Sequence, residues 1–246
     1  MANLVIDIGN TQTKLAIFDE QEIVFFEHFE NISNAQIEEI VSGHHIAKAI
    51  VSSVKNEAGN GIKLDDKIKI YRFNYQMATN INNLYRTSAT LGADRLAAVA
   101  AAVGLNPGKN NLVIDAGTCI TYDFVDAGKN YYGGSISPGL NMRYKAMNNY
   151  TSALPLVSKD PNFSGSTGRD TVTAMQSGVQ NGVKYEAEGF INSYMQQYAS
   201  INIILTGGDG IFLDTLLKNS IFAPYIKNDP YLVLRGLNAI VQEYND

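Results

Sequence analysis

The sequence predicts an α/β protein built from two related lobes that share a cleft. The first observation is a repeat: LVIDIGNTQTKLAIFD, from Leu4, matches LVIDAGTCITYDFVD, from Leu112, at Leu, Val, Ile, Asp, Gly and Thr. Both copies consist of an apolar run, a polar turn with a glycine and a second β-rich run, so each predicts a hairpin. The second observation is that strand-like and helical segments are mixed along the chain, which is typical of an α/β fold.

The first lobe is expected over residues 1–108. After the first hairpin, β-branched and aromatic runs predict strands, and apolar residues at helical spacing predict helices. The breaker cluster Asn106-Pro107-Gly108 ends the last helix and marks the boundary of the lobe. In order, the expected elements are the strand EIVFFEHF, a short helix around AQIEEIV, the β-branched run IAKAIVSSV, the segment KIKIYRF and the helix GADRLAAVAAAVGL.

The second lobe, residues 109–246, is expected to repeat this order. The hairpin is followed by the strand-like YYGGSI and by SPGLNMRYKAM, a loop that runs into a helix. A polar loop at 158–168 precedes a long helical region from Asp170 to about Ser200. The strand INIILTGG and two further helical segments complete the lobe. Two equivalent hairpins, about half the chain apart, therefore predict two lobes that each present a loop to one cleft.

Composition limits the classes of protein that this chain can belong to. The 246 residues are 45% hydrophobic and 17% charged, which suits a folded soluble protein with a core. The apolar stretches are too short for a membrane span, and the N-terminus enters a strand pattern directly, so we expect a cytoplasmic protein without membrane partners. The single Cys119 excludes an intrachain disulfide. A net charge of −5, with no strongly basic run, argues against a nucleic-acid partner.

The polar turns of the two hairpins have the residues that a phosphate site needs. A strand that ends in Asp, Gly, Asn and Thr brings backbone N–H groups, hydroxyls and a carboxylate close to a phosphate and its metal, because glycine lets the backbone approach closely. The plain alternative for one such turn is a strand that ends in an Asx-type turn. Two copies favour a cleft that holds a polyphosphate between two loops.

Six motifs together resemble one protein family. DIGNTQTK, LGADR, DAGTCIT, GGSISPG, GRDT and TGGDG follow one another from Asp7 to Gly210, and in this order they are similar to the type III pantothenate kinases of the actin/Hsp70/sugar-kinase superfamily. The resemblance implies two lobes of the actin-like (ribonuclease H-like) fold with a nucleotide cleft between them. It also implies ATP-dependent phosphorylation of pantothenate to 4′-phosphopantothenate, the first step of coenzyme A biosynthesis.

Two other functions stay open at this point. A related group in the same family acts as non-catalytic accessory factors for transcription, and other kinases of the superfamily act on sugars or short acids. Intact Asp94 and Lys14 and both D-x-G turns favour an enzyme over a regulator. The pairing of LGADR with Tyr85 favours pantothenate over a sugar.

The first turn is expected to bind ATP with a hydrated Mg²⁺ held by Asp7. Magnesium keeps several waters and takes only one or two carboxylates, so a single Asp is enough. Asn10 and Thr11 can donate to phosphate oxygens, and Lys14 adds a compensating charge. By resemblance, Asp115 binds a monovalent cation, K⁺ or NH₄⁺. The expected ATP-binding residues are Asp7, Ile8, Gly9, Asn10, Thr11, Gln12, Thr13, Lys14 and Thr118.

Asp94 in LGADR is the expected catalytic residue. Phosphoryl transfer to an alcohol needs the hydroxyl aligned with the γ-phosphate and an acceptor for its proton, and a carboxylate at the start of a helix can supply both. The guanidinium of Arg95 suits the carboxylate of pantothenate. The alternative is that Asp94 is an N-terminal helix charge and Arg95 a surface residue. The expected substrate-binding residues are Tyr85, Gly92, Ala93, Arg95 and Thr171.

The resemblance also implies a homodimer in which Thr171 of one subunit closes the pantothenate pocket of the other. The long helical region carries an apolar stripe that could pack against its symmetry mate, or simply inside its own lobe. Asp170 is a candidate N-cap for this helix. The stripe consists of Val172, Met175, Val179 and Val183.

Four other features either depart from the family pattern or have an explanation that involves no ligand. Ser88 stands where many relatives have a proline, which puts the rigidity of its loop in question. Cys119 replaces a small residue and is interpreted as a buried small hydrophobe. His44-His45 is interpreted as a solvent-facing pair rather than a zinc site. TGGDG either lines an adenosine site or makes a tight connection from strand to helix.

Overall fold

The computed structural model describes residues 2–53, 61–77 and 80–244, and the chain divides into two compact units. The first unit comprises Met1–Gly108, Gly128–Tyr132 and Tyr231–Asp246. The second comprises Lys109–Ala127 and Gly133–Pro230. The expected lobes of 1–108 and 109–246 differ from these units in two segments, since a short piece at Gly128 and the C-terminal helix belong to the first unit.

The first unit is built on a five-stranded sheet of order β3-β2-β1-β4-β5. β1 pairs antiparallel with β2, β2 antiparallel with β3, and the β1, β4 and β5 pairs are parallel. Leu4, Val5 and Ile6 of β1 are fully buried, because a sheet covered on both faces needs apolar side chains on both. Its strands are β1 (Ala2–Ile8), β2 (Thr13–Asp19), β3 (Glu22–Phe29), β4 (Ile46–Ser53) and β5 (Lys69–Arg72).

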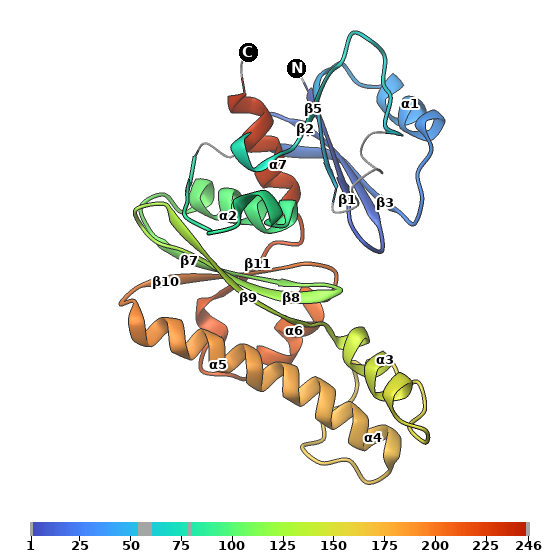
Figure 1. Ribbon diagram of the computed structural model, residues 1–246, viewed down its shortest axis with the longest axis vertical. Coiled ribbons are helices and arrows are strands. Elements are labelled where there is room, and N and C mark those ends of the chain that lie inside the picture. Colours follow the sequence, from blue (N-terminus) through green and yellow to red (C-terminus); the bar gives the residue numbers. More distant parts are fainter. Residues whose placement is uncertain (1, 54–60, 78–79, 245–246) are drawn as a thin grey trace. The chain divides into compact units, whose positions relative to one another are not determined.

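Three helices accompany this sheet: α1 (Asn34–Ser42), α2 (Ala93–Leu105) and α7 (Leu232–Glu243). Figure 1 shows α1 on one side of the sheet and α7 on the other. A capping box between Ser33 and Gln36 starts α1. The predicted helix GADRLAAVAAAVGL is confirmed as α2, and the expected strand IAKAIVSSV as β4, apart from Val54, which lies outside the described residues.

The C-terminal helix belongs to the first unit because it makes both apolar and polar contacts with elements of that unit. α7 packs on α2, β1 and β4. Inside this contact the buried amide of Asn3 donates to Asn238, which in turn donates to Glu20 O. Lys48 Nζ donates to the Val241 and Tyr244 carbonyls and so caps the C-terminal end of the helix.

The second sheet has six strands in the order β11-β10-β7-β8-β9-β6. β7 pairs antiparallel with β8 and parallel with β10, and β10 pairs parallel with β11. Without β6, the order 9-8-7-10-11 repeats the order 3-2-1-4-5 of the first sheet, as the repeated sequence predicts. The strands are β6 (Asn82–Asn83), β7 (Asn110–Ala116), β8 (Cys119–Val125), β9 (Asn130–Pro138), β10 (Ile201–Thr206) and β11 (Ile226–Asn228).

Four helices belong to the second unit, and the long α5 runs along a face of its sheet (Figure 1). A π-helical turn, Ser177–Asn181, joins α4 to α5 without a break in the helical path. A core cluster draws its side chains from β7, β8, β10 and these helices. The helices are α3 (Leu140–Tyr150), α4 (Thr171–Gln176), α5 (Gly182–Gln197) and α6 (Gly210–Leu217).

The apolar stripe on the long helical region packs within its own unit. Met175, Val179 and Val183 are buried members of the second core cluster, whereas Val172 is 43% exposed. The expectation that this stripe forms a dimerisation surface is therefore wrong for three of its four residues. The physical reason is that the three side chains join the apolar core of their own unit, where the π-helical turn packs on α3.

Over residues 2–53, 61–77 and 80–244, no helix combines the length and apolar character that crossing a bilayer requires.

Candidate active site

The loop of the first hairpin is short and open to solvent. Ile8 faces Thr13 in the register, so four residues connect β1 to β2, and the Gly9 N–H donates to Gln12 O at 3.0 Å. A Cβ at Gly9 would lie 3.1 Å from that oxygen, so the tight loop favours glycine. Asn10, Thr11 and Gln12 are exposed.

Asp7 lies at the base of this loop and is 8% exposed. It faces Lys14 across the hairpin and Ser52 of β4 in the parallel register. Burial raises the pKa of Asp7 to about 6; the charge of Lys14 opposes this and the negative charge of Asp94 adds to it. Among the described residues Asp7 Oδ1 has no hydrogen-bond partner. A buried carboxylate oxygen of this kind fits a bound cation or its water.

Asp94 lies in the first turn of α2, next to the N-cap Gly92. Its Oδ1 accepts a hydrogen bond from the Arg95 N–H at 2.8 Å. A Cβ at Gly92 would lie 2.6 Å from the same oxygen, so glycine leaves room for this carboxylate. The negative charge of Asp94 adds to the raised pKa of Asp7, and both residues belong to the first unit.

Arg95 is not a surface residue, as the plain alternative would have it. The residue is only 6% exposed, and its guanidinium carbon lies 5.6 Å from the centroid of the Tyr85 ring, within cation–π range. The Tyr85 ring stacks on Tyr131 at a centroid distance of 6.4 Å. Ser88 Oγ donates to Tyr85 O at 2.7 Å, so a hydrogen bond tightens this turn.

The loop of the second hairpin is one residue shorter between paired positions than the first. Ala116 faces Ile120, and the Gly117 N–H donates to Cys119 O at 2.9 Å. Asp115 therefore faces Thr121, whereas Asp7 faces Lys14. Thr118 is exposed at the tip. The Thr121 hydroxyl is buried and has no hydrogen-bond partner among the described residues.

The TGGDG segment packs against this second loop. Gly207 has φ +91°, and a Cβ there would lie 2.3 Å from Asp115 Oδ1, so the close approach requires glycine. The Asp209 N–H donates to Ala116 O at 2.8 Å. Lys159 forms an ion pair with Asp209. The sequence offered no signal for Lys159, because it lies in an irregular polar loop without periodicity.

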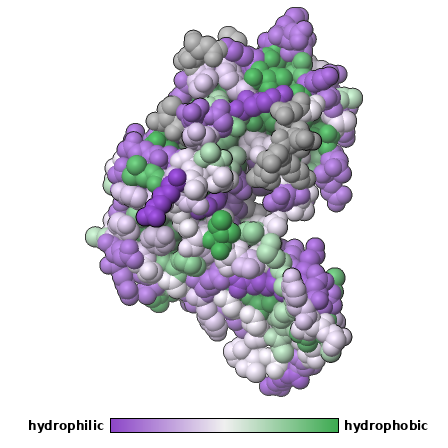
Figure 2. Space-filling model, in the orientation of Figure 1, coloured by the Kyte–Doolittle hydropathy of each residue, from purple (hydrophilic) through white to green (hydrophobic). Residues whose placement is uncertain are grey.

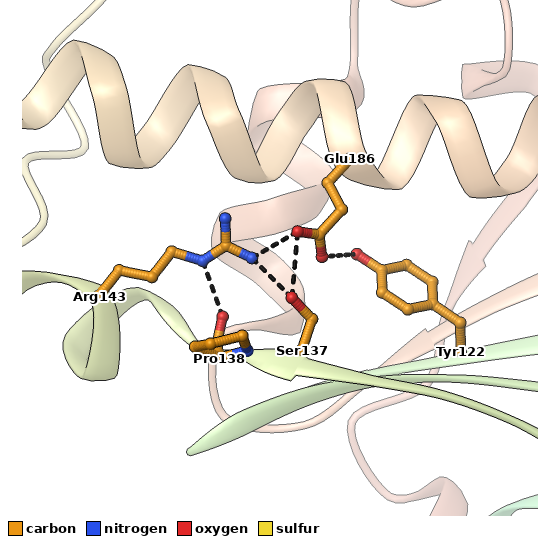
Figure 3. A network of polar contacts seen from close by, with 5 residues as sticks. All are labelled: Tyr122, Ser137, Pro138, Arg143 and Glu186. Atoms are coloured by element: carbon orange, nitrogen blue, oxygen red, sulfur yellow. Dashed lines mark hydrogen bonds and ion pairs between the residues drawn. The ribbon is translucent and has the colours of Figure 1, made fainter. Parts of the chain in front are cut away.

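The GGSISPG segment also supports the second loop. The Gly139 N–H donates to Thr118 O at 3.1 Å, and a Cβ at Gly139 would lie 2.2 Å from Gly117 O. Ser137 and Pro138, just before it, join a polar network with Arg143, Glu186 and Tyr122 (Figure 3). Sequence reasoning missed Arg143 and Glu186, since single charged residues on helices give no pattern.

Thr171 is exposed at the first position of α4. The N-cap Asp170 accepts a hydrogen bond from the Thr173 N–H at 2.9 Å, which confirms its expected capping role. Hydrogen bonds to Thr173 and Val172 lower the pKa of Asp170, the Thr173 N–H having the largest effect. The acid is thus occupied in starting the helix.

Two minor interpretations need correction. Cys119 is partly exposed rather than buried, because it begins β8 directly beside the exposed tip of the second loop. Of the pair His44-His45, His45 is exposed and His44 is not. His44 is half-buried, with Nδ1 3.1 Å from Ile40 O and its ring edge-on to Phe25, since these groups close the end of α1.

Comparisons with known proteins agree on one family. The family model for type III pantothenate kinase matches residues 3–193. A protein of Bacteroides fragilis (strain YCH46) named type III pantothenate kinase is 43% identical over 246 residues, covering 99% of this chain and 98% of that protein. One of Flavobacterium johnsoniae with the same name is 42% identical, covering 89% and 91%.

Solved structures show the fold. A Campylobacter jejuni protein described as a Baf family transcriptional activator has a TM-score of 0.63 at 21% identity, covering 98% of both chains. The activator of 2-hydroxyisocaproyl-CoA dehydratase from Clostridium difficile, with bound ADPNP, has a TM-score of 0.57 at 14% identity, covering 98% of this chain and 95% of that one. These likenesses identify the actin-like α/β fold.

Proposed function

Since the chain belongs to the type III pantothenate kinase family, and thus phosphorylates pantothenate with ATP in coenzyme A biosynthesis, we propose the following roles for its residues. Asp94 is the catalytic base. The observation that carries this role is that its carboxylate is fixed at the start of α2, with its charge acting on Asp7 beneath the first loop.

In the reaction the hydroxyl oxygen of pantothenate attacks the γ-phosphorus of ATP and forms a new O–P bond. The bond from the γ-phosphorus to the bridging oxygen breaks, and ADP leaves with the electron pair. Asp94 orients the hydroxyl and accepts its proton, which is the help that this chemistry needs from a side chain. Arg95, supported by Tyr85, binds the carboxylate of pantothenate, and Gly92 and Ala93 form the backbone beside it.

The first loop binds the phosphates of ATP. The exposed Asn10, Thr11 and Gln12 and the neighbouring residues Ile8, Gly9 and Thr13 supply backbone and side-chain donors, and Lys14 adds positive charge. Thr118 contacts ATP from the second loop. Asp7 would hold Mg²⁺ through water, as its unpartnered buried oxygen supports. When bound, Mg²⁺ neutralises charge that develops on the phosphates.

Asp115 is the residue that would hold a monovalent cation, K⁺ or NH₄⁺. The buried Thr121 hydroxyl faces it across the hairpin, and the Ala116 carbonyl lies next in the chain. Oxygen ligands of this kind suit a hard cation. Activity should therefore need K⁺ or NH₄⁺ in addition to Mg²⁺. Equal rates in buffers that contain only Na⁺ and buffers that contain K⁺ would contradict this role.

The active form is a homodimer in the cytoplasm, with Thr171 reaching the pantothenate pocket of the partner subunit. The support is the exposure of Thr171 and Val172 at the start of α4. On the face drawn in Figure 2, hydrophobic surface occurs in separate groups among hydrophilic residues. We therefore assign no broad apolar patch on that face to the interface.

The test of the catalytic assignment is the variant Asp94→Asn, assayed by ADP release. The amide keeps an oxygen that accepts from the Arg95 N–H but cannot take the proton, so kcat should fall about a hundredfold or more while ATP still binds. Asp65→Asn is the matched control, because Asp65 Oδ1 also accepts a backbone N–H, from Lys67, in the same unit. It should keep full activity.

Full activity of Asp94→Asn would overturn the role of Asp94. The same assay on a panel of pantothenate, sugars and short hydroxy acids separates the substrate classes. ADP release that depends on a sugar and not on pantothenate would identify a sugar kinase, and no ADP release with any acceptor would identify a non-catalytic accessory factor.

A further inference from the structure

The GGSISPG segment has no role in the chemistry described so far, yet it lies directly under the second loop. β9 ends at Pro138, Gly139 is the N-cap of α3, and the Gly139 N–H donates to Thr118 O. A Cβ at Gly139 would lie 2.2 Å from Gly117 O and 2.6 Å from Thr118 O. Any shift of this turn would thus move the backbone of the loop above it.

Two charged side chains fix the turn from the side. Arg143 of α3 donates from Nε to Pro138 O at 2.8 Å and from Nη2 to Ser137 Oγ at 2.8 Å. The same Nη2 contacts Glu186 Oε2 of α5 at 2.6 Å. The guanidinium therefore donates hydrogen bonds to both residues that precede Gly139, and it forms an ion pair with Glu186 of α5 (Figure 3).

The carboxylate of Glu186 is the centre of the network. Besides Arg143 it accepts from Ser137 Oγ at 3.0 Å and from Tyr122 OH at 2.9 Å, so β8, β9 and α3 all bind to one side chain (Figure 3). Burial, followed by the neighbouring Glu186, raises the pKa of Tyr122, which keeps its hydroxyl protonated as a donor. Both oxygens of the carboxylate are thus committed.

We propose that Arg143 and Glu186 are positioning residues for ATP: they hold the Ser137–Gly139 turn so that the Gly117–Thr118 loop keeps the form that binds the nucleotide. This inference rests on the proposed contact of Thr118 with ATP. Arg143 and Glu186 act through the turn and do not touch the reacting atoms.

The alternative is that the pair only stabilises the fold. The side chains of Arg143 and Glu186 are 21% and 24% exposed, so the pair is partly buried and its hydrogen bonds also contribute to stability. The hydrogen bonds nevertheless converge on one turn rather than being spread over the helices. Side chains that are fixed in this way set the geometry of a site, where small displacements are costly.

The chain contains a matched control for the experiment. Lys184 and Glu188 form an ion pair on the same helix, α5, with side-chain exposures of 28% and 25%. The variant Glu188→Ala removes a pair of similar exposure that has no contact with the turn. The test variant is Glu186→Ala, and Arg143→Lys keeps the charge but loses the planar fork that binds Glu186, Ser137 and Pro138 together.

The measurements are the KM for ATP, the KM for pantothenate, the dissociation constant of a non-hydrolysable ATP analogue, and Tm without ligands. We expect Glu186→Ala and Arg143→Lys to raise the KM and dissociation constant for the nucleotide about tenfold. The KM for pantothenate should change less than about twofold. Tm should fall more in Glu186→Ala than in Glu188→Ala, because Tyr122, Ser137 and Arg143 lose their acceptor. Tyr122→Phe, which removes one of the three donors, should give a smaller effect in the same direction.

Three results would overturn the proposal: an unchanged KM for ATP, an equal rise of both KM values, or a rise in Glu188→Ala as large as in Glu186→Ala. If Glu186→Ala does not fold, Tyr122→Phe and Arg143→Lys decide the question by the same criteria. Thr118→Val separates the premise from the inference. An unchanged KM for ATP in Thr118→Val would contradict the proposed contact itself, whereas an effect there and none in the network variants would contradict only the positioning role.

Discussion

The buried Asp7 carboxylate lowers the stability of the fold above about pH 6. Its pKa is raised from 3.8 to about 6, chiefly by burial. The folded state thus keeps a proton between these values that the unfolded chain releases, and stability falls as pH rises through this window. A shift of two units corresponds to about 3 kcal/mol. A bound cation at Asp7 would offset this cost.

The first prediction concerns the neighbours that set this pKa. Asp94→Asn removes a negative charge, so the pKa of Asp7 should fall, whereas Lys14→Met removes the compensating positive charge and should raise it. Titration of the Asp7 carboxyl carbon by NMR, without nucleotide, measures both shifts. Asp65→Asn serves again as the control. No shift in Asp94→Asn would show that Asp94 is too far from the first loop for its proposed role.

A second prediction follows for stability. Asp7→Asn replaces the carboxylate by a group that stays neutral, so above pH 6 the variant should be more stable than the wild type by about 1–3 kcal/mol, and the difference should shrink below pH 4. Urea unfolding at pH 8 and pH 4 measures it. Turnover should be lost at the same time. A variant that is less stable than the wild type at pH 8 would contradict the assigned cause of the shift.

At the scale of elements, the two hairpins show how register alters chemistry. When the two hairpin sequences are aligned without a gap, Thr13 matches Thr121. The loop of the second hairpin is one residue shorter, so Thr121 faces Asp115, whereas Lys14 faces Asp7. A slip of one position turns every side chain of a strand to the other face. One loop thus pairs its aspartate with a positive charge and the other with a hydroxyl.

The π-helical turn between α4 and α5 holds the polar loop at 158–168. Gln180 accepts from the Asp160 N–H and donates to Asp160 O, and Asn181 donates to Gly165 O. The loop carries Lys159, the ion-pair partner of Asp209 in TGGDG. π-Helical turns are local departures from the α-helical path, and here the side-chain amides of the turn bind backbone groups of the loop.

The third prediction concerns the contact of α2 with α7. A Cβ at Gly236 would lie 1.9 Å from Ala97 O, so Gly236→Ala should separate the helices and destabilise the first unit by about 2–4 kcal/mol. Gly104→Ala is the matched control, because its Cβ would meet nothing within 4 Å and alanine favours a helix by up to about 1 kcal/mol. Thermal unfolding of both variants measures the difference. Equal stability of the two would show that the contact adapts.

At the scale of the whole molecule, the fold joins a duplicated sheet to a C-terminal helix that returns to the first unit. The two sheets share the order in which an antiparallel hairpin precedes parallel strands, and each presents a D-x-G loop at the end of its central strand. α7 then packs on α2, which carries Asp94 at its first turn. The packing of the C-terminal helix and the position of the Asp94 carboxylate are therefore linked.

The fourth prediction tests the homodimer by mixing two inactive variants, Asp94→Asn and Thr171→Trp. In a heterodimer one of the two pockets combines the intact Asp94 of one subunit with the intact Thr171 of the other. After random exchange half of the dimers are mixed, so about a quarter of the wild-type activity should return. Val172→Trp, at the neighbouring exposed position, controls for bulk. No recovery despite exchange, or a fully active monomer in sedimentation, would contradict the shared pocket.

The sequence by itself determined the parts of this protein that depend on short stretches of chain. The apolar runs that end in D-x-G specified two hairpins with exposed tips, Gly92 and the following alanine-rich run specified α2 with Asp94 in its first turn, and Asp170 specified the start of α4. In each case propensity, capping and turn chemistry act within a few residues, so a local pattern contains the information.

Only the tertiary structure decided which distant residues meet. It placed Met175, Val179 and Val183 in the core of their own unit, and it placed Gly207 against Asp115. It also joined Arg143 to Glu186 beneath the second loop. These contacts depend on the fit of surfaces far apart in the chain, on the removal of water between them and on a register that one residue can shift. Local periodicity encodes which face of an element is apolar, but not which surface will cover it.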